Sequence, residues 1–344
     1  MEAQVREIAF KYLNNVRELG EDNLRAECPF HDSRSATRSL AINVRTGVWL
    51  CFNEKCGARG ALVQLLRRLG MSGRQVDLFM EHLQLPPPVP EGVRKKAAIN
   101  KVWDLLPEYI LGAYEQCPLQ LVDAGFSEEL LQQNDVGYDA LHDRITFAIR
   151  DYHGRLVAIS GRACEDRVVP RYKVYDARPP DPELGRPAGE LFGVVEKYVP
   201  DNRRHLYGFH SVYPERFFRP AAEWGPLVIT EGYKSTLWLR QLGFTHSVGL
   251  QGSSLSAPQL RMLNKLRGPY YVMLDHEPGK SFPDKNGRCA AVQIAEQLKT
   301  SGKVLLCRYH PDTKIGTAPD DLQHDTIDHM VKNAKTLGQY ALER

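Results

Sequence analysis

The spacing of apolar residues changes along the chain and predicts a different local structure in each region. Near the N-terminus, apolar residues recur at helical spacing from Val5 to Leu19 and again from Leu62 to Leu69. These two predicted helices flank a polar segment that carries cysteines. In the middle of the chain, apolar runs at 145–149 and 156–159 predict two strands, which the turn at 151–154 would join as a hairpin.

From Pro226 onward, short apolar runs alternate with amphipathic stretches. The runs predict buried strands at 227–230, 246–250, 270–274 and 304–308. The stretches between them predict helices that begin at Tyr233, Ser256 and Arg288. Alternating strands and helices are typical of a mostly parallel sheet covered on both faces. We therefore predict an α/β fold for this region, within a multidomain α+β chain.

Two proline-rich segments interrupt these patterns. Residues 85–91 read LPPPVPE and are followed by three basic residues, whereas residues 178–189 read RPPDPELGRPAG. Proline has no backbone donor, so neither segment can lie inside a helix or a sheet. We expect the first to be a linker and the second a surface insertion.

Composition and charge narrow the class of protein. A length of 344 residues allows roughly two or three domains, and a hydrophobic content of 42% excludes disorder of the whole chain. The net charge is only +3, so any contact with nucleic acid must come from locally arranged basic groups. No apolar run is long enough for a membrane span, and charged residues interrupt the first thirty positions. We expect a cytoplasmic protein.

Three cysteines and a histidine form two close pairs that indicate a metal site. Cys28 and His31 are separated by two residues, and Cys51 and Cys56 by four, with nineteen residues between the pairs. Two such pairs, brought together by a hairpin, can bind one tetrahedral zinc ion as in zinc ribbons. Four protein ligands leave no open position, so the predicted zinc is structural. The alternative is that these are ordinary buried cysteines. We expect the remaining Cys117, Cys164, Cys289 and Cys307, which show no such pairing, to be core or surface thiols.

Cationic and aromatic residues surround the predicted ligands. The cations are Arg34, Arg38, Arg45, Lys55 and Arg59, and the aromatic residues are Phe30, Trp49 and Phe52. Bases of a single strand can stack on aromatic rings while cations follow the phosphates. In so small a module the aromatic residues can equally form the core, and the composition leaves both interpretations open.

Acidic residues follow the predicted strands of the α/β region. Glu231 comes directly after the run at 227–230, Asp275 and Glu277 follow the run at 270–274, and Asp320 lies beyond the run at 304–308. Carboxyl ends of parallel strands meet at one edge of a sheet. Acids that converge there repel one another unless a cation lies between them, and oxygen ligands select Mg²⁺ or Mn²⁺. The alternative is a set of unrelated, solvated loop residues.

The segment at 278–281 reads PGKS and is similar to the end of a phosphate-binding Walker A loop. That motif requires a glycine five positions before Gly279, where this chain has Leu274. The sequence does not support a nucleotide-hydrolysing motor.

Several of these segments resemble DnaG-type primases of bacteria and phages. The zinc-binding domain of that family, of the CHC2 type, is similar to CPFH, WLCFNEKCGARG and the leucine helix, although the second pair is usually separated by two residues. The basic polymerase subdomain is similar to HDRITFAIRDYHGRLVAISGRA, PRYK and LYGF. The Toprim module is similar to VITEGYKS and YVMLDHE.

The resemblance implies a role for each matching residue. Template and nucleotide contacts would involve Arg144, Arg162, Arg171, Lys173 and Lys234. The Mg²⁺ or Mn²⁺ ligands would be Glu231, Asp275, Glu277 and Asp320. Glu277 stands where the family usually has an aspartate, and Ser235 also replaces an aspartate, so Asp312 or Asp284 could compensate. Gly287-Arg288 resembles the pair that normally follows the acids closely, so 278–286 would be an insertion.

The implied domains are a zinc ribbon at 1–84, a linker at 85–98, a basic α+β subdomain at 99–225, a Toprim α/β sheet with flanking helices at 226–325 and a helical tail at 326–344. The implied function is synthesis of RNA primers from nucleoside triphosphates on a single-stranded DNA template. A replicative helicase is an expected partner, although the family's usual helicase-interacting domain is absent from this sequence. The alternatives are a Toprim-type nuclease or topoisomerase and a non-catalytic, zinc-dependent single-strand-binding protein.

Overall fold

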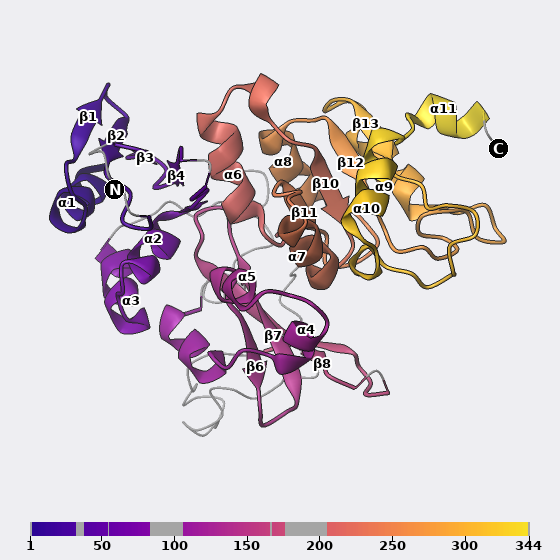
Figure 1. The fold of residues 1–344 in the computed structure, drawn as a ribbon, viewed down its shortest axis with the longest axis horizontal. Coiled ribbons are helices and arrows are strands. Elements are labelled where there is room, and N and C mark those ends of the chain that lie inside the picture. The colour runs from indigo at the N-terminus through magenta and orange to yellow at the C-terminus, as the bar shows by residue number, and fades with distance from the viewer. Residues whose placement is uncertain are drawn as a thin grey trace, which may run out of the picture. The chain divides into compact units, whose positions relative to one another are not determined.

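The computed structural model describes residues 2–31, 38–53, 55–82, 106–165, 167–175 and 205–342. The proline-rich segments expected to be a linker and an insertion lie outside the described residues. The chain forms two compact units. The first comprises Met1–Cys117, Asp135–Pro200 and Tyr213–Pro220, and the second Pro118–Asn134, Asp201–Val212 and Ala221–Arg344. Figure 1 shows the fold, with labels on helices and strands of both units.

The first unit begins with a helix and a small antiparallel sheet. Its strand order is β1-β2-β3-β4-β5. The elements are α1 (Glu2–Tyr12), β1 (Arg17–Leu19), β2 (Asn23–Ala26), β3 (Leu40–Asn43), β4 (Trp49–Cys51), β5 (Arg59–Gly60), α2 (Leu62–Arg68) and α3 (Gly73–His82). Apolar side chains of α1, α2 and the strands form one core around the fully buried Trp49, whose indole Nε1 donates to the Ala61 carbonyl at 2.8 Å.

The predicted helix at 5–19 is too long at its C-terminal end. The helix ends at Tyr12, and Asn15 has a φ of 54°, which turns the chain. Residues 17–19 then pair with β2, with Arg17 opposite Arg25. Val16 still packs against the same core as the helix. The apolar spacing therefore continues from the helix into a strand. The prediction of a helix beyond Tyr12 is wrong.

The first unit also contains a second antiparallel sheet, of order β6-β7-β8-β9. The elements around it are η2 (Glu108–Tyr114), β6 (Val136–Asp139), β7 (Arg144–Arg150), β8 (Leu156–Ala163) and β9 (Tyr172–Val174). The predicted hairpin is confirmed as β7 and β8. Its turn forms because Asp151 Oδ1 accepts the backbone N–H of His153 and of Arg155, both at 2.9 Å, and Gly154 takes a φ of 81°.

The second unit is built on a parallel sheet of order β11-β10-β12-β13. Its elements are α4 (Leu119–Asp123), α5 (Glu128–Gln133), η5 (Ala221–Glu223), β10 (Leu227–Thr230), α7 (Tyr233–Gln241), β11 (Ser247–Gly249), α8 (Ala257–Leu266), β12 (Tyr270–Val272), α9 (Ala290–Leu298), β13 (Val304–Leu306), η6 (Pro319–Asp321), α10 (His324–Lys332) and α11 (Leu337–Leu342). Helix α6 (Phe209–Phe218) runs from this unit into the first. The four predicted strands and the three predicted helices are confirmed, which makes the fold mixed α/β.

Helices cover both faces of the parallel sheet. Leu239 of α7 and Met330 of α10 pack with Val228 and Met273 on one face. Alternation along β12 directs Tyr270 to the other face, where its hydroxyl donates to the Leu263 carbonyl of α8 at 3.2 Å. The chain leaves β10 toward β11 and then crosses to β12 on the other side. Such a switch in strand order opens a crevice at the carboxyl ends of the two strands.

Candidate functional site: a carboxylate cluster and a cysteine-histidine cluster

Three acids meet at the switch point of the parallel sheet. Glu231 follows β10, and Asp275 and Glu277 come after β12. All three surround one ammonium group, Lys280 Nζ, which lies 3.1 Å from Glu231 Oε1, 3.5 Å from Asp275 Oδ2 and 3.1 Å from Glu277 Oε2. The acids therefore form one cluster, with a lysine at its centre.

Asp320 is held beside this cluster by the start of α7. Its Oδ2 lies 3.0 Å from Lys234 Nζ, and its Oδ1 accepts a short hydrogen bond from the Ser235 hydroxyl. The turn that carries it is fixed by Asp321, whose Oδ2 accepts the backbone N–H of Ala318 at 2.8 Å. Asp320 is thus near enough to Asp275 to raise its pKa, while Asp321 shapes the turn.

The electrostatics of the cluster are dominated by closely spaced negative charges. Burial, and then the Glu231 and Asp320 carboxylates, raise the pKa of Asp275 to about 6, although Lys280 opposes the shift. Burial alone would lower the pKa of Lys280, but Glu231, Asp275 and Glu277 together raise it. Burial and the nearby Asp275 raise the pKa of Tyr309 as well. The site therefore disfavours an additional negative charge and favours a cation.

Two buried oxygens of the cluster remain available for a ligand. Among the described residues, neither Glu231 Oε2 nor Asp275 Oδ1 has a hydrogen-bond partner. A buried carboxylate oxygen without a partner is costly. Hard oxygen ligands on more than one strand end are the donor set that Mg²⁺ and Mn²⁺ prefer. The acids of the cluster therefore offer the type of donor atom that a divalent ion would use.

Asp312 and Asp284, which could compensate for the missing acids, have contacts with other residues. The Asp312 side chain is 91% exposed and lies beside His310. Asp284 Oδ1 accepts the backbone N–H of Asn286 and of Arg288, which closes a turn. Sequence reasoning missed Lys280, which it treated only as part of a Walker-like segment. Its spacing of three residues from Glu277 was the available signal.

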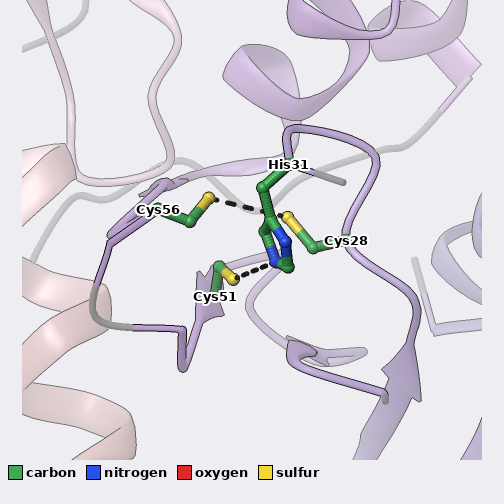
Figure 2. A group of neighbouring side chains, drawn as sticks. All are labelled: Cys28, His31, Cys51 and Cys56. Carbon is green, nitrogen blue, oxygen red and sulfur yellow. Dashed lines mark hydrogen bonds between the residues drawn. The ribbon is translucent and has the colours of Figure 1, made fainter. Parts of the chain in front are cut away.

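The predicted zinc ligands converge in the first unit. The ligand atoms of Cys28, His31, Cys51 and Cys56 all lie within 4.8 Å of one another. Cys28 Sγ is 3.9 Å from Cys56 Sγ, and His31 Nε2 is 3.4 Å from Cys51 Sγ. Ligands about 2.3 Å from a tetrahedral zinc lie about 3.8 Å apart. Figure 2 shows the four side chains directed toward a common centre. The four residues therefore form a candidate metal-binding site with a suitable donor set.

Neighbouring polar groups orient two of these ligands. The Ser39 hydroxyl lies 3.2 Å from His31 Nε2 and 3.6 Å from Cys51 Sγ. The Asn53 backbone N–H donates to Cys51 Sγ at 3.4 Å. The hydrogen bond with Cys28 lowers the pKa of Cys51, and the Asn53 and Ser39 contacts act in the same direction. These contacts favour the thiolate of Cys51, which is the form that binds a metal, whereas the hydrogen bond with Cys51 raises the pKa of Cys28.

The aromatic residues around this site contribute mainly to packing. Phe30 packs on Trp49 with ring centroids 5.4 Å apart. Phe52 lies under the guanidinium of Arg25, 4.2 Å from its ring centroid. Arg59 pairs with Glu215 at 2.5 Å. Arg34 lies outside the described residues.

Three of the five cations predicted to bind template or nucleotide share one face of the second sheet of the first unit. Arg144 is opposite Ala163, Gly161 is opposite Lys173, and Ala163 bonds to Arg171. Alternation therefore places Arg144, Arg171 and Lys173 on one face and Arg162 on the other. Arg144 is buried, and its guanidinium donates to the carbonyls of Gly161, Pro170 and Arg171. Arg171 is exposed, and Lys173 is half-buried.

Comparison with known proteins gives these sites a context. No protein-family model matches the chain. The DNA primase of Deinococcus radiodurans is 26% identical over 307 residues, which cover 76% of this chain and 48% of that primase. The DNA primase of Escherichia coli K12 is 28% identical over 204 residues, which cover 59% of this chain and 29% of that primase. The chain is similar to bacterial DNA primases.

This similarity has a limited extent. The chain spans less than half of the length of these two primases. Among solved structures, it is similar to the Aquifex aeolicus primase with its zinc-binding and RNA polymerase domains, at a TM-score of 0.49 and 18% identity, covering 97% of this chain and 84% of that one. The resemblance to DnaG-type primases expected from the motifs is confirmed by the sequence relatives.

The described part of the chain contains no helix that is both long and apolar enough to cross a membrane.

Proposed function

We propose that this chain is a DNA primase, which joins nucleoside triphosphates into short RNA primers on a single-stranded DNA template. The observation that carries the proposal is the convergence of Glu231, Asp275 and Glu277 at the switch point of a parallel sheet, with Asp320 beside them. The similarity of the chain to proteins named DNA primases supports it, and it favours a primase over a strand-cleaving enzyme.

Glu231, Asp275, Glu277 and Asp320 would bind Mg²⁺ or Mn²⁺. When bound, such ions orient an attacking 3′-hydroxyl and stabilise the charge on the leaving pyrophosphate. The chain's own residues position the reactants. Lys234 pairs with Asp320, and its ammonium would contact a triphosphate bound beside that acid.

The basic sheet of the first unit would contact the template and the incoming nucleotide. Arg171 and Lys173 share one face of this sheet, and two cations on one face support a phosphate-binding role. Arg144 would act indirectly, because its guanidinium fixes the carbonyls of β8 and the segment before β9. Arg162 lies on the other face and would serve a separate contact.

The cysteine-histidine cluster would bind a structural zinc ion, and the domain around it would help to select the initiation site. We further propose the domain boundaries given by the motifs, a cytoplasmic location, and a replicative helicase as partner. The chain's similarity to primases supports these assignments.

The test is a primer-synthesis assay with the full chain. The protein is incubated with a mixed single-stranded DNA template, labelled ribonucleoside triphosphates and either Mg²⁺ or Mn²⁺, and the products are separated by length. Short RNA that requires template is the expected result. Template binding without RNA under either ion would contradict the proposal, and so would cleavage of the DNA without added triphosphates.

A further inference from the structure

Lys280 occupies the centre of the carboxylate cluster. Its ammonium group contacts three carboxylates at 3.1–3.5 Å, and its side chain is 23% exposed. A lysine ammonium has three N–H donors, one for each of these acids. Lys280 therefore stands where a cation shared by Glu231, Asp275 and Glu277 would bind.

Hydrogen bonds hold the backbone of Lys280 in place, whereas its side chain has several rotatable bonds. The Lys280 backbone N–H donates to the Glu277 carbonyl at 3.1 Å, and its carbonyl accepts the backbone N–H of Ala291 at 3.0 Å. The Cys289 thiol donates to the same carbonyl at 3.3 Å. The backbone of the residue is thus anchored to the start of α9, and only the long side chain has to move for the ammonium to leave the cluster.

The charge of the cluster is only partly compensated by this lysine. One ammonium faces three carboxylates, and Glu231 Oε2 and Asp275 Oδ1 have no hydrogen-bond partner among the described residues. A divalent ion would compensate the charge better and would use the same oxygens. It cannot do so while the ammonium lies between them, because two cations a few ångström apart repel.

We propose that Lys280 is an internal cation that competes with the divalent ion for Glu231, Asp275 and Glu277. Divalent binding displaces the ammonium, so Lys280 weakens the affinity of the cluster for metal while it stabilises the metal-free protein. Lys280 is a positioning residue for this site, and the inference rests on the proposed metal-binding role of these acids. A purely structural ion pair would not affect metal affinity in this direction.

The experiment measures Mn²⁺ binding by electron paramagnetic resonance of the free ion, using the full chain with its zinc retained. Lys280→Met removes the charge and keeps the length of the side chain, and Lys280→Arg keeps the charge. Lys285→Met is the matched control, because Lys285 is an exposed lysine of the same segment. Glu231→Gln and Asp275→Asn each remove a proposed ligand, so the Mn²⁺ binding that these variants lose is the binding at the cluster.

We expect K280M to bind the cluster Mn²⁺ about 10- to 30-fold more tightly than the wild type, the scale for loss of one charge beside a divalent ion. K280R and K285M should bind like the wild type. As a second measurement, added Mn²⁺ should raise the melting temperature of K280M more than that of the wild type, because ligand binding stabilises the folded state.

Two different failures can be distinguished. Equal Mn²⁺ affinity in K280M and the wild type, with binding still lost in D275N, would overturn the role of Lys280 and leave the metal site intact. Absence of Mn²⁺ binding that depends on Glu231 or Asp275 in any of the proteins would overturn the proposed metal site and this inference with it.

Discussion

The Ser235 hydroxyl donates a hydrogen bond to Asp320 Oδ1, which joins the first turn of α7 to the turn η6. Ser235 stands at a position where the resemblance to primases leads one to expect an acid. In this chain the position supplies a donor, and with Lys234 it holds the remaining acid in place. A hydroxyl donor at this position thus orients Asp320, one of the acids that we propose as metal ligands.

The Ser235→Ala substitution tests this contact. Ser235 is buried, and loss of a hydrogen bond to a charged acceptor costs about 1.5–3 kcal/mol. We expect the free energy of opening that protects the α7 and η6 amides to fall by this amount, so that their hydrogen exchange becomes faster. Ser254→Ala, at an exposed serine, is the control and should leave those amides unchanged. Unaltered protection of α7 and η6 in S235A would show that the contact is energetically unimportant.

Glu231→Gln tests the proposed catalysis. The substitution preserves the shape of the side chain and removes the charge that would bind a divalent ion, so we expect primer synthesis to fall about 100-fold or more while the circular dichroism spectrum is unchanged. Glu296→Gln is the control, because Glu296 is exposed and pairs only locally with Lys299. Primer synthesis by E231Q at a rate near that of E296Q would contradict a catalytic role for Glu231.

Cys28→Ser tests the zinc site. We expect about one zinc per chain in the wild type, as measured by elemental analysis, and its loss in C28S because three ligands and a hydroxyl bind zinc far more weakly than four ligands do. Cys164→Ser, which changes a half-buried cysteine outside the cluster, should retain the ion. Wild-type protein without zinc, or C28S with a full equivalent, would contradict the assignment.

Arg150 supports the first unit through buried ion pairs. Its guanidinium donates to Glu108 Oε1 at 2.6 Å and lies 2.7 Å from Asp135 Oδ2, and its side chain is 1% exposed. Arg150→Met removes this partner from two acids that still pair with Arg67, so we expect a cost of up to about 3–5 kcal/mol, the scale for loss of one partner of a buried pair. We expect the free energy of opening to fall by this amount, so that hydrogen exchange of the β7 and β8 amides becomes faster. The same change at the exposed Arg167 should cost no more than about 0.5 kcal/mol.

The Asp275→Asn substitution should change stability in a pH-dependent way. The pKa of Asp275 is about 6 in the folded protein and 3.8 as its ordinary value, so only the folded state holds this proton between those two pH values. Stability therefore falls as the pH rises through this window, and the loss is complete above about pH 6. D275N has no carboxyl proton to lose at this position, so its stability should not fall in this way.

Urea unfolding between pH 4 and 8, without added divalent ion, measures this effect. The stability of D275N relative to the wild type should increase by about 3 kcal/mol from the acid to the alkaline end. Asp312→Asn makes the same charge change at an exposed side chain and is the control. A flat difference for D275N would mean that Asp275 ionises as freely in the fold as in the unfolded chain.

Local patterns in the sequence determined much of the architecture. Apolar runs with turn residues between them were sufficient for the β7–β8 hairpin and for the four parallel strands, since the period of side-chain burial depends on the backbone alone. The close pairs Cys28–His31 and Cys51–Cys56 likewise specified the cysteine-histidine cluster, because residues so near in the chain need only one hairpin to meet.

Other features were decided only by the tertiary structure. The strand at 17–19 depends on pairing with β2, so local spacing could not separate it from the preceding helix. The faces of the sheet taken by Arg144 and Arg162 follow from register, which strand partners set. The place of Lys280 among Glu231, Asp275 and Glu277 depends on where β10 and β12 lie side by side. Contacts of this kind form between chain segments far apart, and no local period encodes them.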